Sequence, residues 1–280
     1  MSSFRVLPSI LILFFLAACD TPAPEPPAAV SETPAVAEKP ADPPVNAGIA
    51  WFDGGVEDAF ALAKSENKPL FLYWGAVWCP PCVEIRNTVF KSQRFIGQSR
   101  QFVPVYLDGD TERAQSWGEH FGTKVYPTMI VFNPPGEEVT RLNAGIDISA
   151  YNDILEISLE QMRPITELAR SAMWSPASLE EADFLQLAYY SWYDDKALPD
   201  DAPVDFFLRL SDAAAGVSPA ASARLYLQHA TQAVSEGQPA DPNRVSAILS
   251  DPELLFASWD YLFTPEQILP NLGGDEASLA

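Results

Sequence analysis

The stretch from Lys68 to Cys82 reads KPLFLYWGAVWCPPC, and it is the most informative part of the chain. Residues 70–76 form an unbroken apolar run, which predicts a strand that is buried on both faces of a sheet. Two cysteines separated by two prolines follow directly. A helix is expected over residues 81–93, because proline is tolerated in the first turn of a helix. The stretch therefore predicts a strand, a cysteine pair and a helix, in that order.

The sequence on both sides continues this alternation of helices and strands. Apolar spacing and turn residues predict further helices over 55–64, 113–121 and 149–162, and further strands over 102–107, 128–132 and 139–142. Helices that alternate with strands in this way are typical of an α/β domain. We expect that domain to span residues 49–163.

Two motifs together resemble the thioredoxin superfamily, namely the stretch at 68–82 and YPTMIVFNPPGEEV at 126–139. They are most similar to the C-terminal periplasmic domain of DsbD-type membrane reductases and to thioredoxin-like lipoproteins. The resemblance implies a thioredoxin fold, which is a mixed central sheet flanked by helices. It also implies a cis peptide bond between Tyr126 and Pro127 that faces the cysteine pair, where the backbone can pair with an extended substrate.

The cysteine pair suits dithiol–disulfide exchange. Two cysteines three positions apart at the start of a helix can reach the Cα separation that a disulfide requires. Cys79 is expected at the helix N-terminus, where unpaired amides and the helix dipole favour the thiolate that attacks a disulfide. Cys82 lies one turn further in and is expected to resolve the mixed disulfide.

Five neighbouring residues are expected to position the substrate. Pro80 and Pro81 stiffen the loop and remove two backbone amides, and Trp78 offers an apolar ledge to a partner. Tyr126 and Pro127 would act through the cis bond that the resemblance implies.

One residue departs from the family pattern. Thioredoxin proper has a buried acid six positions before the first cysteine, and Tyr73 stands there in this chain. Proton transfer at Cys82 must then differ, or use water. Three acids in the vicinity, Glu84, Asp108 and Asp110, are interpreted as solvated surface or turn residues.

Other uses of a CxxC pair fit the sequence less well. Structural zinc requires four ligands, and the chain has no second CxxC or histidine cluster. Haem attachment requires a histidine after the second cysteine, where Val83 stands. A structural disulfide that closes so small a loop would contribute little stability. We therefore expect no metal and no cofactor.

The N-terminal part predicts export and anchoring. Residues 1–18 are typical of a signal peptide, since their apolar run is too short to span a membrane comfortably. LAAC at 16–19 resembles the bacterial lipobox, which implies cleavage before Cys19 and its lipidation; an ordinary signal peptide with a chance cysteine is the alternative. Residues 19–48 are rich in proline and alanine, which predicts an extended tether.

The remaining residues carry no recognisable motif. Apolar spacing predicts a helical domain of unknown role over 164–270, with helices near 178–193, 203–214, 219–236 and 243–263. Its aromatic residues, including Trp174 and Trp259, are interpreted as core. Residues 271–280 are expected to form a disordered tail.

These features predict a membrane-anchored, periplasmic protein-disulfide reductase, with the inner membrane favoured. Its expected partners are periplasmic proteins that carry disulfides and a separate membrane electron donor. Nucleic acid is not an expected partner, because the formal net charge is −21. Two alternatives remain open: a docking lipoprotein whose helical region recruits a partner, and a disulfide oxidase or isomerase.

Overall fold

The computed structural model describes residues 48–143, 145–192 and 197–263. The predicted signal peptide (1–18), the lipidation site Cys19, nearly all of the predicted tether and the predicted tail (271–280) lie outside the described residues. The account that follows concerns the described part of the chain only.

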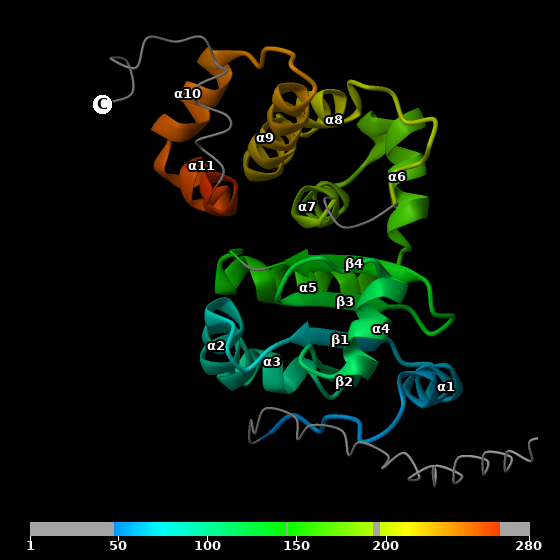
Figure 1. The fold of residues 1–280 in the computed structure, drawn as a ribbon. Coiled ribbons are helices and arrows are strands. Elements are labelled where there is room, and N and C mark those ends of the chain that lie inside the picture. Colours follow the sequence, from blue (N-terminus) through cyan, green and yellow to red (C-terminus); the bar gives the residue numbers. More distant parts are fainter. Residues whose placement is uncertain (1–47, 144, 193–196, 264–280) are drawn as a thin grey trace, which may run out of the picture. The chain divides into compact units, whose positions relative to one another are not determined.

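Four strands form a mixed sheet in the order β2-β1-β3-β4 (Figure 1). They are β1 (Leu70–Gly75), β2 (Val103–Asp108), β3 (Thr128–Phe132) and β4 (Glu138–Asn143). β1 is parallel to β2 and antiparallel to β3, and β3 is antiparallel to β4. All six residues of β1 are buried, as its unbroken apolar run predicts for a strand with helices on both faces.

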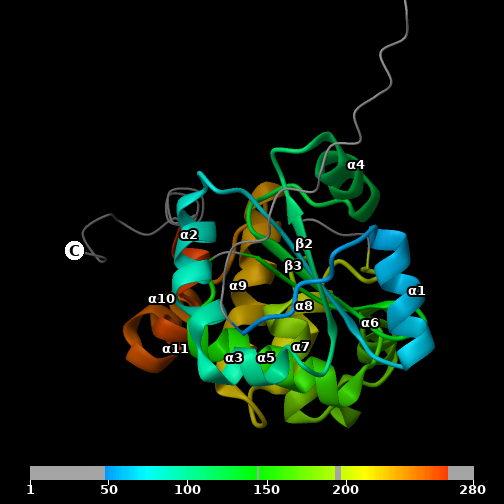
Figure 2. The ribbon, with the colours of Figure 1, turned by 90° about the horizontal axis from the view of Figure 1, so that it is seen from below.

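Helices cover both faces of this sheet (Figure 2). Leu72 and Trp74 of β1 share a hydrophobic cluster with α1 (Val56–Glu66) and α4 (Glu112–Phe121). Phe71 and Tyr73, which alternate with them, belong to a second cluster on the opposite face. The helices on that face are α2 (Pro80–Asn87), α3 (Gln93–Gln98) and α5 (Ile148–Gln161).

The helix predicted over residues 81–93 is wrong in its length. α2 ends at Asn87, and a 3-10 turn, η1 (Val89–Lys91), follows. The Ser92 side chain then accepts a hydrogen bond from the amide of Phe95, at 3.1 Å, and so caps the new helix α3. A capping serine is a stronger local signal than continued apolar spacing, and it marks the break.

The C-terminal region is helical, as predicted. It contains α6 (Ile165–Trp174), η2 (Pro176–Ser178), α7 (Glu181–Tyr189), α8 (Phe206–Ala214), α9 (Pro219–Ser235), α10 (Pro242–Ser250), α11 (Pro252–Ala257) and η3 (Trp259–Phe263). α6 was not predicted, although its apolar residues recur at helical spacing. The helix predicted over 243–263 divides at Asp251, whose side chain caps α11. Trp174 and Trp259 are 75% and 53% exposed, so their assignment to the core is wrong.

The helical region packs directly against β4. Gln186 of α7 donates a hydrogen bond from Nε2 to the carbonyl oxygen of Val139, at 2.7 Å. The amide of Ser191 donates to the carbonyl oxygen of Arg141, at 2.9 Å. One hydrophobic cluster also runs from the sheet through α5 to α9. Within the described ranges, no helix has the length and apolar character needed to cross a membrane.

Candidate active site

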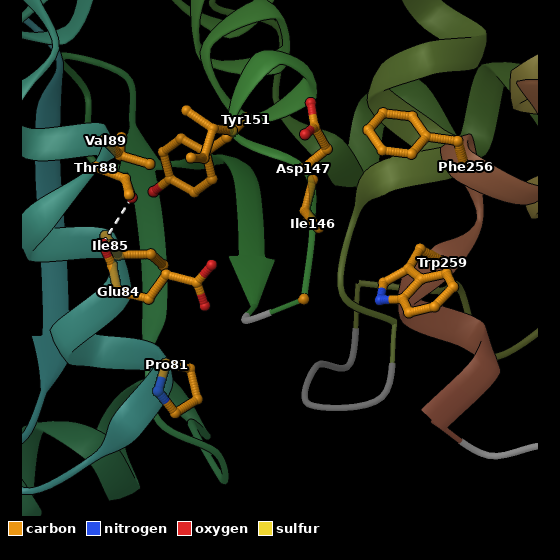
Figure 3. Close-up of a pocket in the computed structure, with 12 residues that line it drawn as sticks. Pro81, Glu84, Ile85, Thr88, Val89, Ile146, Asp147, Tyr151, Phe256 and Trp259 are labelled. Carbon is orange, nitrogen blue, oxygen red and sulfur yellow. Dashed lines mark hydrogen bonds between the residues drawn. The ribbon is translucent and has the colours of Figure 1, made fainter.

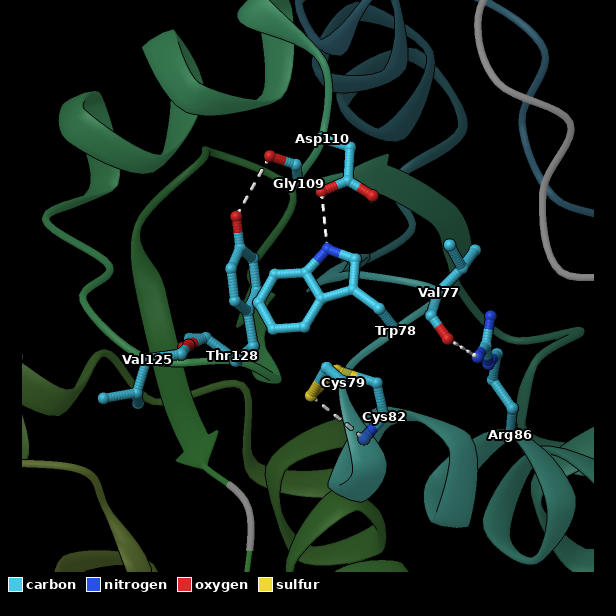
Figure 4. Close-up of a disulfide and its surroundings, with 10 residues drawn as sticks. Val77, Trp78, Cys79, Cys82, Arg86, Gly109, Asp110, Val125 and Thr128 are labelled. Carbon is cyan, nitrogen blue, oxygen red and sulfur yellow. Dashed lines mark hydrogen bonds between the residues drawn. A yellow bond between two sulfur atoms is a disulfide. The ribbon is translucent and has the colours of Figure 1, made fainter.

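The two cysteines lie at the end of β1, where α2 begins (Figure 4). Cys79 is the N-cap residue of α2 and forms a disulfide with Cys82, with the two Cα atoms 5.2 Å apart. The amide of Cys82 donates a hydrogen bond to Sγ of Cys79, at 3.3 Å. After reduction, the same amide and the positive end of the helix dipole would stabilise a thiolate on Cys79.

The two prolines explain why this one amide faces the sulfur. Pro80 and Pro81 occupy the first two positions of α2, where amides would have no partner within the helix. Because proline has no amide hydrogen, Cys82 supplies the first amide of the helix. Pro80 is exposed and Pro81 is half-buried, so the loop presents one apolar face to solvent.

Trp78 stands next to the pair and is held in place by the loop after β2. It is 64% exposed, and its Nε1 donates a hydrogen bond to Oδ1 of Asp110, at 2.7 Å. Its ring also meets the ring of Tyr126 edge-on, with the centroids 5.7 Å apart. The ring that the sequence analysis placed beside the thiol therefore has a defined orientation.

Tyr126 connects the same loop to the cysteines. Its ring stacks on Trp74, with centroids 4.0 Å apart, and its hydroxyl donates to the carbonyl oxygen of Gly109, at 3.0 Å. Burial raises the pKa of this hydroxyl, so it stays a donor at neutral pH. Tyr126 also packs against the small buried cluster that contains Cys79 and Cys82.

The Tyr126–Pro127 peptide bond is cis, as the resemblance implied. Pro127 is buried and directly precedes β3. The hydroxyl of Thr128 donates to the carbonyl oxygen of Val125, at 2.7 Å, and closes the turn around this bond (Figure 4).

Sequence reasoning missed the loop that orders this site. Asp110 was interpreted as a solvated turn residue, yet it accepts the hydrogen bond from Trp78. A Cβ atom on Gly109 would lie 2.2 Å from the Tyr126 hydroxyl, so a larger residue would displace that ring. The sequence did contain a signal for this arrangement. Both β1 and β2 were predicted, and the loops that follow adjacent parallel strands lie at the same edge of the sheet, so the residues after β2 could have been expected near the cysteine pair.

Tyr73, at the position where thioredoxin proper has a buried acid, is buried in β1. Its ring packs against Phe90, with centroids 4.9 Å apart, and stacks on Tyr106. Burial raises the pKa of its hydroxyl well above the ordinary value, and the hydroxyl has no hydrogen-bond partner among the described residues. Tyr73 therefore stays protonated near neutral pH and cannot act as a base there.

The described part of the chain contains no group of three or more His, Cys, Asp or Glu residues that could hold a metal ion.

Comparisons with known proteins match part of this chain. Residues 56–157 match the family model described as a thioredoxin-like domain. Similar solved structures include a DsbH oxidoreductase (16% identity, TM-score 0.37, 43% of this chain and 91% of that one). They also include a protein from Bacteroides thetaiotaomicron proposed to be a disulphide isomerase (29% identity, TM-score 0.36, 41% of this chain and 95% of that one). A third is a disulphide isomerase from Xylella fastidiosa Temecula1 (20% identity, TM-score 0.32, 39% of this chain and 95% of that one). No curated protein matches the chain.

Residues 56–157 therefore match a thioredoxin-like domain, and the Cys79–Cys82 pair lies within that range, at the start of α2.

Proposed function

We propose that this protein is a membrane-anchored thiol–disulfide oxidoreductase that reduces disulfides of periplasmic proteins. The observation that carries the proposal is the hydrogen bond from the amide of Cys82 to Sγ of Cys79 at the first turn of α2. It directs a donor at the sulfur that would become the attacking thiolate. Trp78 and the Tyr126–Pro127 turn flank the same sulfur pair and would position the substrate.

The proposed reaction is a two-step exchange. The Cys79 thiolate attacks one sulfur of a substrate disulfide, and the other substrate sulfur leaves as a thiolate that takes up a proton. Cys82 then loses its proton and attacks Sγ of Cys79, which releases the second substrate thiol. The substrate has gained two electrons and two protons, and the Cys79–Cys82 disulfide remains. A separate membrane protein with a dithiol would reduce that disulfide for the next cycle.

Anchoring and compartment rest on the sequence. The lipobox-like LAAC at 16–19 supports lipidation of Cys19, and the proline-rich residues 19–48 support a tether to the membrane. Labelling cells with a radioactive fatty acid tests this part separately. Wild-type protein is expected to incorporate the label and Cys19→Ala is not; equal labelling of the two would contradict the anchor.

The catalytic proposal is tested by reduction of insulin with dithiothreitol as the electron source. Wild-type protein is expected to shorten the lag before insulin precipitates, and Cys79→Ser is expected to behave as buffer alone. Cys82→Ser is expected to accumulate a mixed disulfide with insulin, because the resolving thiol is missing. If wild type and Cys79→Ser do not differ, the proposal is wrong, and the docking alternative gains support.

The direction of the reaction is tested in intact cells. Acid quenching followed by alkylation preserves the redox state of the peptide that carries Cys79 and Cys82. A mostly reduced pair shows that a donor supplies electrons in an oxidising compartment, as a reductase requires. A mostly oxidised pair contradicts the reductase proposal and favours an oxidase or a docking protein.

A further inference from the structure

A pocket of about 250 Å³ lies beside the redox loop (Figure 3). Pro81 and Glu84 of α2 form one side, Ile146 and Asp147 lie between β4 and α5, and Phe256 and Trp259 form the opposite side. Pro81 directly precedes Cys82, so one side of the pocket belongs to the first turn of the helix that carries the redox pair. The helical region thus supplies a wall that the thioredoxin-like domain alone would lack.

The wall that carries Phe256 and Trp259 is anchored from inside the protein. Arg224 of α9 is 2% exposed and donates to the carbonyl oxygen of Ala257, at 2.7 Å, and to Oδ2 of Asp260, at 2.7 Å. The same guanidinium lies over the ring of Tyr189, 3.8 Å from its centroid. A buried arginine thus holds the backbone carbonyl of Ala257, before Trp259, and the side chain of Asp260, after it, which anchors the segment that carries the two exposed aromatic rings.

The pocket combines apolar walls with negative charge. The described residues that line it include two acids, Glu84 and Asp147, and no Lys, Arg or His. Within the described part of the chain, neither acid forms an ion pair. Asp147 caps α5, because its Oδ1 accepts hydrogen bonds from the amides of Ser149 and Ala150. Phe256 is 62% exposed and Ile148 is 37% exposed. Large apolar side chains left open to solvent beside unpaired acids complement a ligand that is itself apolar and basic.

We propose that this pocket docks a segment of the substrate polypeptide that carries a large apolar side chain and a lysine or arginine near its disulfide cysteine. This inference rests on the proposed function and adds a substrate preference to it. The apolar side chain packs against Phe256 and Trp259, and the cation lies near Glu84 and Asp147. Docking holds the neighbouring substrate disulfide at Cys79, where the exchange described above follows without any additional reactant.

The test uses the full chain with the substitution Cys82→Ser, in its reduced form. This variant can form a mixed disulfide through Cys79 but cannot resolve it, so it traps the product of the first step. It is offered an equimolar mixture of two disulfide-linked peptide dimers of equal length. One peptide carries Phe and Arg next to its cysteine, and the other carries Ser and Glu there. Each productive attack leaves one peptide on Cys79 and releases one peptide thiol, so mass spectrometry counts the two adducts directly.

The trap is expected to favour the Phe–Arg peptide by about tenfold or more, which is the effect of burying one large apolar side chain. Adding Phe256→Ala and Trp259→Ala is expected to reduce this preference to below about threefold. Trp174→Ala, which removes an even more exposed tryptophan, from α6, is the matched control and should keep the full preference. Glu84→Gln with Asp147→Asn should lower the preference, as should added salt, and asparagine can still cap α5.

Equal labelling by both peptides, or a preference that survives loss of both rings, would overturn the docking proposal alone. Hydroxyethyl disulfide, which is too small to need a pocket, separates this result from a failure of the proposed function. If the reduced trap reacts with neither the peptides nor hydroxyethyl disulfide, Cys79 is not an exchange nucleophile, and both proposals are wrong.

Discussion

At the scale of single residues, the start of α2 makes the two cysteines chemically unequal. Cys79 is 3% exposed and its Sγ accepts a hydrogen bond from the Cys82 amide, whereas Cys82 is 0% exposed and belongs to the first helical turn. In the reduced protein we expect iodoacetamide at neutral pH to label Cys79 first, by at least about tenfold, because the thiolate is the reactive form. Peptide mass spectrometry after a short pulse measures the ratio. Cys79→Ser is the control, and faster labelling of Cys82 in the wild type would contradict the assignment.

The buried hydroxyl of Tyr73 gives a second prediction. Tyr73→Phe removes a polar atom that has no partner among the described residues, so stability at neutral pH should stay equal or rise by up to about 1 kcal/mol. The rate of disulfide exchange should not change, because burial raises the pKa of this hydroxyl and keeps it protonated. Thermal unfolding and the insulin assay measure the two effects. A slower variant would show that Tyr73 takes part in proton transfer.

The same burial fixes the sign of a pH effect. An unfolded tyrosine loses its proton near pH 10, and folded Tyr73 keeps its proton to higher pH. The unfolded state therefore loses protons first, and stability should fall as the pH rises above about 10. Tyr106 and Tyr151 have pKa values raised by burial too, so Tyr73→Phe should reduce the loss without abolishing it.

Single residues also show what sequence reasoning can reach. The spacing of Cys79 and Cys82 is a local feature of the sequence, and the role of Pro127 was implied by the resemblance of the two motifs to the thioredoxin superfamily. The partnership between Trp78 and Asp110 was not recognised, because the two are 32 positions apart and an aspartate after a strand usually faces solvent. Contacts of this kind depend on which strands are adjacent, and that information is not local.

At the scale of elements, the loop between β2 and α4 sets the orientation of the redox loop. Asp110→Ala removes the acceptor for Trp78 and should lower kcat/KM for insulin about three- to tenfold, the value of one charge-assisted hydrogen bond on a partly exposed side chain. Asp110→Asn keeps an acceptor oxygen and should lower it less. If both variants match the wild type, the orientation of Trp78 does not matter for catalysis.

The edge strand β4 is a second element whose neighbours contribute to stability. β4 lies at one end of the strand order, and Gln186 of α7 donates to the carbonyl oxygen of Val139 on that strand. Gln186 is 0% exposed, so Gln186→Ala leaves a buried carbonyl unpaired and should cost about 1–3 kcal/mol. Chemical denaturation measures the loss. Gln93→Ala, at an exposed position of α3, should change stability by much less.

At the scale of the whole described part of the chain, the order of elements was predictable but their packing was not. Alternating helices and strands followed by helices was expected from apolar spacing. The joining of the two regions depends on residues such as Gln186 and Ser191, whose types do not indicate that they bond to β4. The sequence also did not reveal that the rings of Phe256 and Trp259 are exposed, because apolar residues on a helix usually indicate core.

The shared core leads to a prediction about cooperativity. One hydrophobic cluster includes Phe71 and Met129 of the sheet, Leu155 of α5, Leu187 of α7 and Leu225 of α9. Because the two regions bury the same apolar surface, we expect the protein to unfold in a single transition. Far-ultraviolet circular dichroism and tryptophan fluorescence should then give the same Tm.

Truncation tests the same argument more strictly. A chain that ends at Arg163 would lose α6 to α11, and with them the apolar side chains that these helices contribute to the cluster containing Val139, Leu142 and Leu155. It would also lose the donors that pair the free edge of β4, and an unpaired edge strand promotes aggregation. We expect this chain to aggregate or to unfold without a sharp transition, whereas the full-length chain should unfold at a single Tm. If the shorter chain unfolds cooperatively at that same Tm, the shared cluster contributes little, and the thioredoxin-like domain is stable by itself.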